Sequence, residues 1–563
     1  GLAWVMMEDY REEVPRQLLQ ANGRSATVLG REGIEGDFAG RMAHEYAAQV
    51  FPGFPADVQE ILRGFAAGVN FFIDTHRDDL SEWVDSEFTA LDVAARDLRV
   101  WDQGAVRNLL RARVRSESRE GSEGREGSET REASQAPGTP AGVEGSEWVD
   151  PDVGSNAWAF GPERTTSNKA ILVRNPHLTY TSGYYEAQVT VPGILNFYGD
   201  FRLGGPFTII GGFNDRLGWS TTNNYGDPNQ VYALLKDPEN PDAYLFDGAS
   251  REIRTQPVTV NFLDSDSLGS LTRDFRFTRL GPVLLENQDT VFVLKTPALR
   301  QHRLGEQWLR MMQANTLEEW KEAMRIQAKY SSNFTYADAD GNIFYVWNAS
   351  MPLLPHEPSE GAPVFAAGIE DVWTELFPWD DLPQVLNPRG GYVQNTNDSP
   401  YYTNMNQPLD PEDYPPNFPE PRLRFRTQNS LELVDTDRVM SLEDVVVLKH
   451  SMKMIMADRV KDDLVSAVRA GNPTGETAEA IALLETWDNR TARESRGAGS
   501  AGRRMSRQPG LLPGHRVSRR HRWKVQGPNR GCVGAGGGVR GNPKGVFGSH
   551  LWKQQPGRLS TFL

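Results

Sequence analysis

Gly154 and Ser155 are the residues whose types and position could do chemistry most directly. They stand where a segment rich in Ser, Arg, Glu and Gly ends and an apolar, strand-like pattern begins. Cutting the bond between them would give Ser155 a free α-amine, whose ordinary pKa of about 7.7 to 8.0 suits a general base at neutral pH. One residue would then be both nucleophile and base, without an Asp-His relay. Gly-Ser pairs also occur in the linker and the tail, and the plainer interpretation of such a pair is a turn.

Other common catalytic signatures are absent from the sequence. No Gly-rich phosphate loop with Lys follows a strand, no His-Glu-x-x-His helix is present, and Ser155 does not lie in a Gly-x-Ser-x-Gly elbow. The nine His residues are scattered without the spacing of zinc ligands. The single thiol, Cys532, excludes an internal disulfide and a thiolate cluster.

Composition narrows the class of protein. The chain has 563 residues and a net charge of -15, which argues against nucleic acid as a partner because phosphate binding is driven by positive charge. No apolar run approaches the roughly 18 residues of a membrane helix. Residues 1–7 lack the basic start and apolar core of a signal peptide. We therefore expect a soluble protein without a membrane span.

The elements that would position Ser155 change type along the chain. Residues 1–113 are expected to be helical, with an apolar stripe from Val58 to Ile73 and a helix start after Pro55. Residues 114–154 form a linker too polar to offset its ordering entropy. Short apolar runs at 170–173, 188–198 and 207–210 then predict strands, and helical patterns return at 317–327 and 441–487. This irregular mixture favours α+β layers over a doubly wound sheet.

The last part of the chain has an unusual charge. From Arg490 onward there are 16 Lys and Arg and one acidic residue, Glu494, with little aliphatic content. One interpretation is a basic arm for nucleic acid or an anionic surface. The interpretation we prefer is a change of reading frame near Gly497, which would make residues 497–563 an aberrant tail.

Five segments resemble, in the same order, motifs of the penicillin acylase family of N-terminal nucleophile hydrolases, in particular its acyl-homoserine lactone and cephalosporin acylase branch. The resemblance implies a four-layered αββα core, and α and β chains cut from one precursor with release of 114–154 as a spacer. Residues 155–496 would be the catalytic β-chain region. The five segments are 154–158, 175–178, 211–223, 336–343 and 391–400.

The same resemblance implies a role for each matching residue. Ser155 would be the nucleophile and, through its α-amine, the base. The Asn397 side-chain N–H and the Asn223 main-chain N–H would stabilise the oxyanion, and His177 would orient or support the amine. Arg426 is a weaker match to an active-site Arg, with a surface charge as the alternative. Asn395 would share the strand face of Asn397 and support it.

Two further groups of positions bear on substrate and metal. Leu178, Gly211 and Tyr225 match positions that are Phe in penicillin G acylase, and Gly211 would open space for a medium or long aliphatic acyl chain. Asp227 matches a ligand of that enzyme's calcium site. Asn229 and Gln230 stand in place of a main-chain carbonyl ligand and a second carboxylate, and losing a carboxylate weakens the site. The chemistry itself would need no cofactor.

The resemblance therefore implies an autoprocessed amidohydrolase that cleaves N-acyl amides, either acyl-homoserine lactones or β-lactam-type acyl amides. It connects the chain with quorum quenching and antibiotic biosynthesis, in the periplasm or outside the cell. Two alternatives stay open, a catalytically incomplete fragment of such an enzyme and a binding protein with a basic tail. Only the hydrolase predicts cleavage between Gly154 and Ser155.

Overall fold

A computed structural model describes residues 1–498 apart from 85–86, 103, 107–108, 110–153, 179–182, 208, 227 and 360–361. The chain divides into two compact units, Gly1–His450 and a second that begins at Ser451. This division falls inside the region 155–496 that the sequence treats as one. Of the expected spacer and tail only Gly154, Gly497 and Ala498 lie among the described residues.

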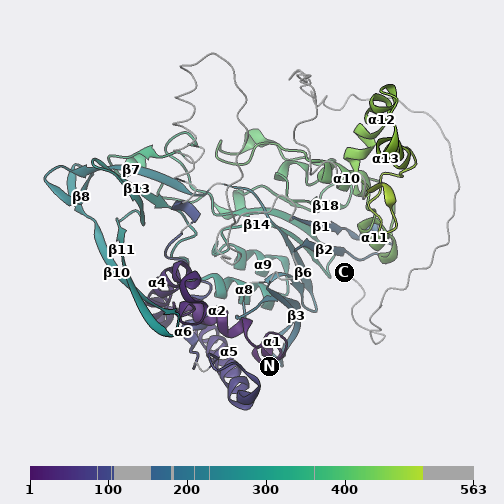
Figure 1. Ribbon diagram of the computed structural model, residues 1–563. Helices are drawn as coiled ribbons and strands as arrows, with labels where there is room; N and C mark the ends of the chain where they lie inside the picture. Colours follow the sequence, from purple (N-terminus) through teal and green to yellow (C-terminus); the bar gives the residue numbers. More distant parts are fainter. Residues whose placement is uncertain are drawn as a thin grey trace. The chain divides into compact units, whose positions relative to one another are not determined.

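The beginning of the first unit is helical, as the sequence predicts (Figure 1). Helix α5 begins after Pro55, and its apolar stripe, which includes Leu62 and Val69, is buried against the neighbouring helices. The helices of this region are α1 (Leu2–Asp9), α2 (Glu13–Ala21), α3 (Ala26–Leu29), α4 (Ile34–Val50), α5 (Ala56–Thr75) and α6 (Ala90–Ala95).

After the helical region, two antiparallel sheets contain the strands that surround Ser155. The first has the order β18-β1-β2, with β1 (Gly154–Phe160) between β2 (Ile171–His177) and β18 (Tyr392–Asn395). The second has the order β17-β15-β14-β6-β5-β4-β3. Its strands are β3 (Tyr184–Val191), β4 (Leu195–Arg202), β5 (Ile209–Phe213), β6 (Leu217–Thr222), β14 (Ser331–Asp338), β15 (Ile343–Ala349) and β17 (Gln384–Leu386).

Helices cover the outer face of each sheet. On the seven-stranded sheet, α8 (Leu304–Gln313) and α9 (Leu317–Met324) place Trp308 and Trp320 against Phe334 of β14. On the three-stranded sheet, α10 (Phe425–Val434) and α11 (Leu442–Lys449) share an apolar cluster with Trp158 of β1. The layers therefore run helix, sheet, sheet, helix, and the expected α+β sandwich is confirmed.

A third sheet and a long hairpin were not anticipated from the sequence. Strand β16 pairs with β7 in that sheet, and the hairpin packs on α4 through Phe38 and Phe275, whose rings are 5.4 Å apart. The strands involved are β7 (Gln230–Asp237), β8 (Asn240–Phe246), β9 (Ala249–Glu252), β12 (Val283–Glu286), β13 (Thr290–Lys295) and β16 (Val364–Phe365), with β10 (Arg254–Asp264) and β11 (Ser267–Phe277) forming the hairpin.

The second unit is small in its described part. Helices α12 (Ile455–Ala470) and α13 (Gly475–Glu485) pack around Ile481, Leu484 and Trp487. Both helices fall within the segment 441–487, where the sequence predicts helix.

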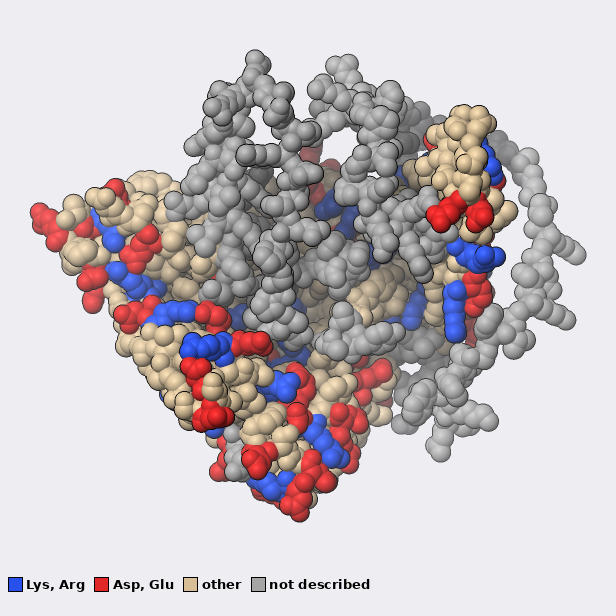
Figure 2. Space-filling view, in the orientation of Figure 1, with Lys and Arg blue, Asp and Glu red and all other residues tan. Residues whose placement is uncertain are grey.

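Figure 2 shows basic and acidic side chains interspersed over the N-terminal helices, not gathered by sign on the face in view. Of the helices that the structure describes, none combines the length and apolar character needed to cross a membrane.

Candidate active site

Ser155 lies near the start of β1, between two neighbouring strands. It is 7% exposed and stands opposite Pro176 of β2, while Gly154 stands opposite His177. Two residues along β1, Ala157 stands opposite Asn395 of β18 and Arg174 of β2. Because alternate residues of a strand share a face, the Ser155 side chain and these neighbours face the seven-stranded sheet.

Asn397 contacts Ser155 directly, although 242 positions separate them in the chain. Its Oδ1 accepts the Ser155 main-chain N–H at 2.6 Å, and its Nδ2 donates to the Asn223 carbonyl at 2.9 Å. Both partners fix the orientation of the amide, since an N–H can only donate and a carbonyl can only accept. Nδ2 carries a second hydrogen, for which the described residues show no acceptor. The structure thus brings together Ser155, Asn223 and Asn397.

Arg426 reaches the same point from the start of α10. One guanidinium nitrogen donates to the Ser155 carbonyl at 2.6 Å and to Asn156 Oδ1 at 2.9 Å, and the other donates to Asn397 Oδ1 at 2.8 Å. Burial and the neighbouring positive charge of Arg424 lower the pKa of Arg426, yet a guanidinium stays charged at physiological pH. Arg426 is therefore a contact of Ser155, and its alternative interpretation as a surface charge does not describe the structure.

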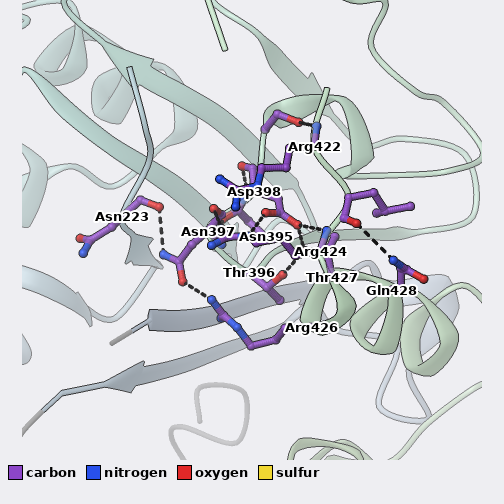
Figure 3. Close-up of polar contacts among 12 residues, drawn as sticks. Asn223, Asn395, Thr396, Asn397, Asp398, Arg422, Arg424, Arg426, Thr427 and Gln428 are labelled. Atoms are coloured by element: carbon purple, nitrogen blue, oxygen red, sulfur yellow. Dashed lines mark hydrogen bonds and ion pairs between the residues drawn. The ribbon is translucent and has the colours of Figure 1, made fainter. Parts of the chain in front are cut away.

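The backbone of Asn397 is held in an uncommon conformation. Its φ of 69° lies in the left-handed region, which Asn tolerates better than most residues. Asn395 Oδ1 accepts the Asn397 main-chain N–H at 2.8 Å, and Arg424 donates to the Asn397 carbonyl while pairing with buried Asp398 (Figure 3). Thr427 also donates to Asp398. These contacts fix the direction in which the Asn397 amide points.

A buried polar network supports Asn395 and Asn223 between the two sheets. Asn333 Nδ2 donates to Asn395 Oδ1 at 3.0 Å, to the Asn223 carbonyl at 3.1 Å and to Thr222 Oγ1 at 3.0 Å. Tyr345 donates to Asn333 Oδ1 at 2.7 Å, and Thr222 donates to Asn395 Oδ1 at 2.5 Å. All except Asn223 are at most 2% exposed, so their polar atoms rely on one another. The network links both expected oxyanion residues to Asn333 of β14, Asn223 directly and Asn397 through Asn395.

His177 lies on β2 beside the site, where its ring contacts two side-chain amides. Its Nε2 is 3.2 Å from Asn175 Nδ2 and 3.4 Å from Asn156 Nδ2, so this nitrogen accepts and the proton lies on Nδ1. Burial lowers the pKa of His177, and the charges of Arg426 and Lys449 lower it further. The neutral ring is linked to Arg426 through Asn156, which both contact.

The three expected pocket residues differ in their surroundings. Leu178 is 40% exposed and Tyr225 is 41% exposed, and the Arg424 guanidinium lies over the Tyr225 ring at 5.4 Å. A Cβ placed on Gly211 would overlap Cδ of Arg174. The expectation that Gly211 opens space is therefore wrong, because the Arg174 side chain fills it.

The proposed calcium ligand cannot be placed. Asp227 lies outside the described residues. Over the described part of the chain, no three or more His, Cys, Asp or Glu side chains are grouped so that they could hold a metal ion.

Several site residues were not singled out from the sequence. Asp398 directly follows Asn397, and Arg424 stands two positions before Arg426, so their closeness in sequence to two expected site residues was the available signal. Asn333 and Tyr345 carried no signal, since only the pairing of β14 with β6 and β15 brings them beneath the site.

The described fold and site agree with the comparison to protein families. The family description "Penicillin amidase" matches residues 1–506, and the chain belongs to this family.

Named relatives are similar over much of the chain. Acyl-homoserine lactone acylase PvdQ of Pseudomonas fluorescens (strain Pf0-1) is 27% identical over an alignment of 491 positions that covers 78% of this chain and 60% of that protein. Aculeacin-A acylase of Actinoplanes utahensis is 26% identical over an alignment of 417 positions that covers 65% of this chain and 52% of that protein. Thermostable penicillin G acylase from Alcaligenes faecalis aligns with a TM-score of 0.47 at 19% identity, covering 60% of this chain and 59% of that one. The chain thus spans 60% or less of the length of these relatives.

Proposed function

We propose that this protein cuts itself between Gly154 and Ser155 and then hydrolyses the linear amide bond of N-acylated substrates through an ester on Ser155. The observation that carries the proposal is the pair of side-chain hydrogen bonds to the Ser155 backbone. Asn397 Oδ1 lies 2.6 Å from its nitrogen and Arg426 lies 2.6 Å from its carbonyl oxygen. The names of two relatives, which include acyl-homoserine lactone and aculeacin A, support N-acyl compounds as the substrate class.

In the self-cleavage step, the Ser155 hydroxyl attacks the Gly154 carbonyl carbon. The peptide nitrogen leaves as the ester forms, and water then opens the ester, so that Gly154 ends in a carboxylate and Ser155 in an amine. Gly154 suits this position because a Cβ there would lie 2.6 Å from Arg426 Nη2 and 3.0 Å from Asn397 Oδ1. Any larger residue would displace the groups that hold the bond.

In the hydrolytic step, the α-amine of Ser155 takes the hydroxyl proton. It would stay against Asn397 Oδ1, while the Arg426 charge disfavours its protonated form and lowers its pKa. The oxyanion would be met by the second N–H of Asn397 and the main-chain N–H of Asn223. This chemistry uses no cofactor, and we place the enzyme in the periplasm or outside the cell.

Intact-mass measurement of the purified chain tests the first step. Wild type should give a fragment whose N-terminus is Ser155, and Ser155→Ala should stay uncut. The linker supplies a matched control, because it holds another Gly-Ser pair at Gly145 and Ser146. Ser146→Ala should cleave like wild type. An uncut wild-type chain, or a new N-terminus at Ser146, would refute the proposal.

The hydrolytic step is tested separately from the self-cleavage step. Processed protein should release amine from N-acyl amides of simple amines. Cleavage at Ser155 with no amine released by the wild type would refute the hydrolytic step alone.

A further inference from the structure

We propose that the Arg174 side chain, which forms an ion pair with Asp200, fills the part of the active site where the substrate's acyl chain would lie. Arg174 would thereby limit the length of acyl chain that the site accepts. The inference rests on the proposed function, and it gives a role to a residue that none of the motifs above assigns. It starts from the space beside Gly211. A Cβ at this position would overlap Arg174 Cδ and lie 3.0 Å from Arg174 Nε, so any side chain at position 211 and the Arg174 side chain exclude each other.

The strand register places Arg174 on the face of the nucleophile. Ser155 pairs with Pro176 and Ala157 pairs with Arg174, so Arg174 follows the Ser155 position at a distance of two residues, about 7 Å along the strands. Gly211 pairs with Ser220 on the facing sheet, whose strand β6 packs against both β1 and β2. An acyl group on the Ser155 hydroxyl would enter the space between the sheets, where Arg174 stands.

Asp200 holds the Arg174 side chain in this space. The two side chains form an ion pair, and Asp200 is 5% exposed. Burial lowers the pKa of Arg174, and the negative charge of Glu186 raises it. A desolvated pair of this kind contributes little net stability compared with apolar residues of the same volume. Its position beside the nucleophile suits a role in shaping the site.

A site filled by Arg174 should accept shorter acyl chains than the open pocket expected at Gly211. Binding of straight-chain alkanoates should strengthen with length only until the chain meets Arg174. The double variant Arg174→Ala/Asp200→Ala removes the pair without leaving a lone buried charge. It should move the preferred length upward by several carbons, with affinity rising about fourfold for each added methylene that becomes buried.

The experiment measures calorimetric binding of alkanoates from butanoate to dodecanoate, together with turnover of N-acyl amides of the same lengths. Arg174→Met keeps most of the volume without the charge and should keep the wild-type length limit. The matched control is Arg216→Ala, which removes an exposed Arg–Asp pair with Asp340 at 2.7 Å and should change nothing. Gly211→Leu in the Arg174→Ala background should restore the short limit, and this holds even if the double variant folds poorly.

An unchanged length preference in the double variant, a shift caused by Arg216→Ala, or no alkanoate binding to any variant would overturn the inference. Cleavage at Ser155 with an unchanged preference would refute only the role of Arg174. A shifted binding preference in a chain that never cleaves would support the role of Arg174 and refute the proposed function.

Discussion

Replacing Gly154 with Ala should slow self-cleavage by roughly ten- to a hundredfold. The added Cβ would lie 2.6 Å from Arg426 Nη2, closer than real Cβ contacts come. Arg426 cannot swing away freely, because it donates to the Ser155 carbonyl at 2.6 Å and to Asn397 Oδ1 at 2.8 Å. Losing one charged hydrogen bond costs about 1.5 to 3 kcal/mol, and each 1.4 kcal/mol is a factor of ten in rate.

The assay follows the appearance of the Ser155 N-terminus over time by mass spectrometry. Gly64→Ala is the control, because nothing lies within 4 Å of its added Cβ in α5. It should cleave at the wild-type rate. In an Arg426→Ala background, Gly154→Ala should slow cleavage less than it does in the wild type, since the closest contact of the added Cβ, at 2.6 Å, is gone. Cleavage of Gly154→Ala at the wild-type rate, or full additivity of the two changes, would refute the reasoning.

Three further predictions follow from contacts around the site. Arg426→Gln should move the acidic limb of the pH–rate profile upward by roughly one unit, because the charge that lowers the amine pKa is lost; an unmoved limb would show that the charge does not act on the amine. Asn333→Leu should lower the free energy of unfolding by about 3 kcal/mol and slow cleavage, since it leaves buried partners unpaired; equal thermal melts for Asn333→Leu and wild type would contradict this. The pKa of His177 is lowered by burial and by the charges of Arg426 and Lys449, so the folded state binds fewer protons than the unfolded state below pH 6.5. The contribution of neutral His177 to the free energy of unfolding is complete above that pH and is lost as the pH falls. From pH 7 to pH 5 the melting temperature should therefore fall further for wild type than for His177→Gln, and equal falls would contradict this prediction.

The mixture of helices and strands was predictable from local patterns, whereas the four-layered order was expected only from the family resemblance. The stripe in α5 and the apolar run that became β2 follow from side-chain periodicity, which is fixed by the geometry of a helix or a strand. The run expected at 188–198 is instead divided between β3 and β4, and the run at 207–210 overlaps the start of β5. The hairpin of β10 and β11 was missed although buried and exposed residues alternate from Val258 to Phe262 in β10. Its buried positions pack on α4, a partner far away in the sequence, and three of its leucines, Leu263, Leu268 and Leu271, are exposed.

The site was predictable to the extent that order along the chain reflects a shared ancestry. The motif order identified Ser155, Asn223, Asn397 and Arg426 as candidates, and the structure brings all four into contact. Local pattern could not say whether Arg426 lies at the surface or at the site. That depends on how α10 packs against the three-stranded sheet. The packing brings Arg426, in the first turn of α10, within hydrogen-bond distance of Ser155, although 271 positions separate the two residues in the sequence.

By itself, the sequence determined the type of residue at the start of β1, the helical character of the N-terminal region and the polar linker between them. Only the tertiary structure decided what faces Ser155 across the space between the sheets. Gly211 predicts an open pocket when it is considered alone, yet Arg174 enters from the other sheet and fills it. The physical reason is that contacts between stacked sheets depend on strand register, and a shift of one residue would turn Arg174 to the opposite face.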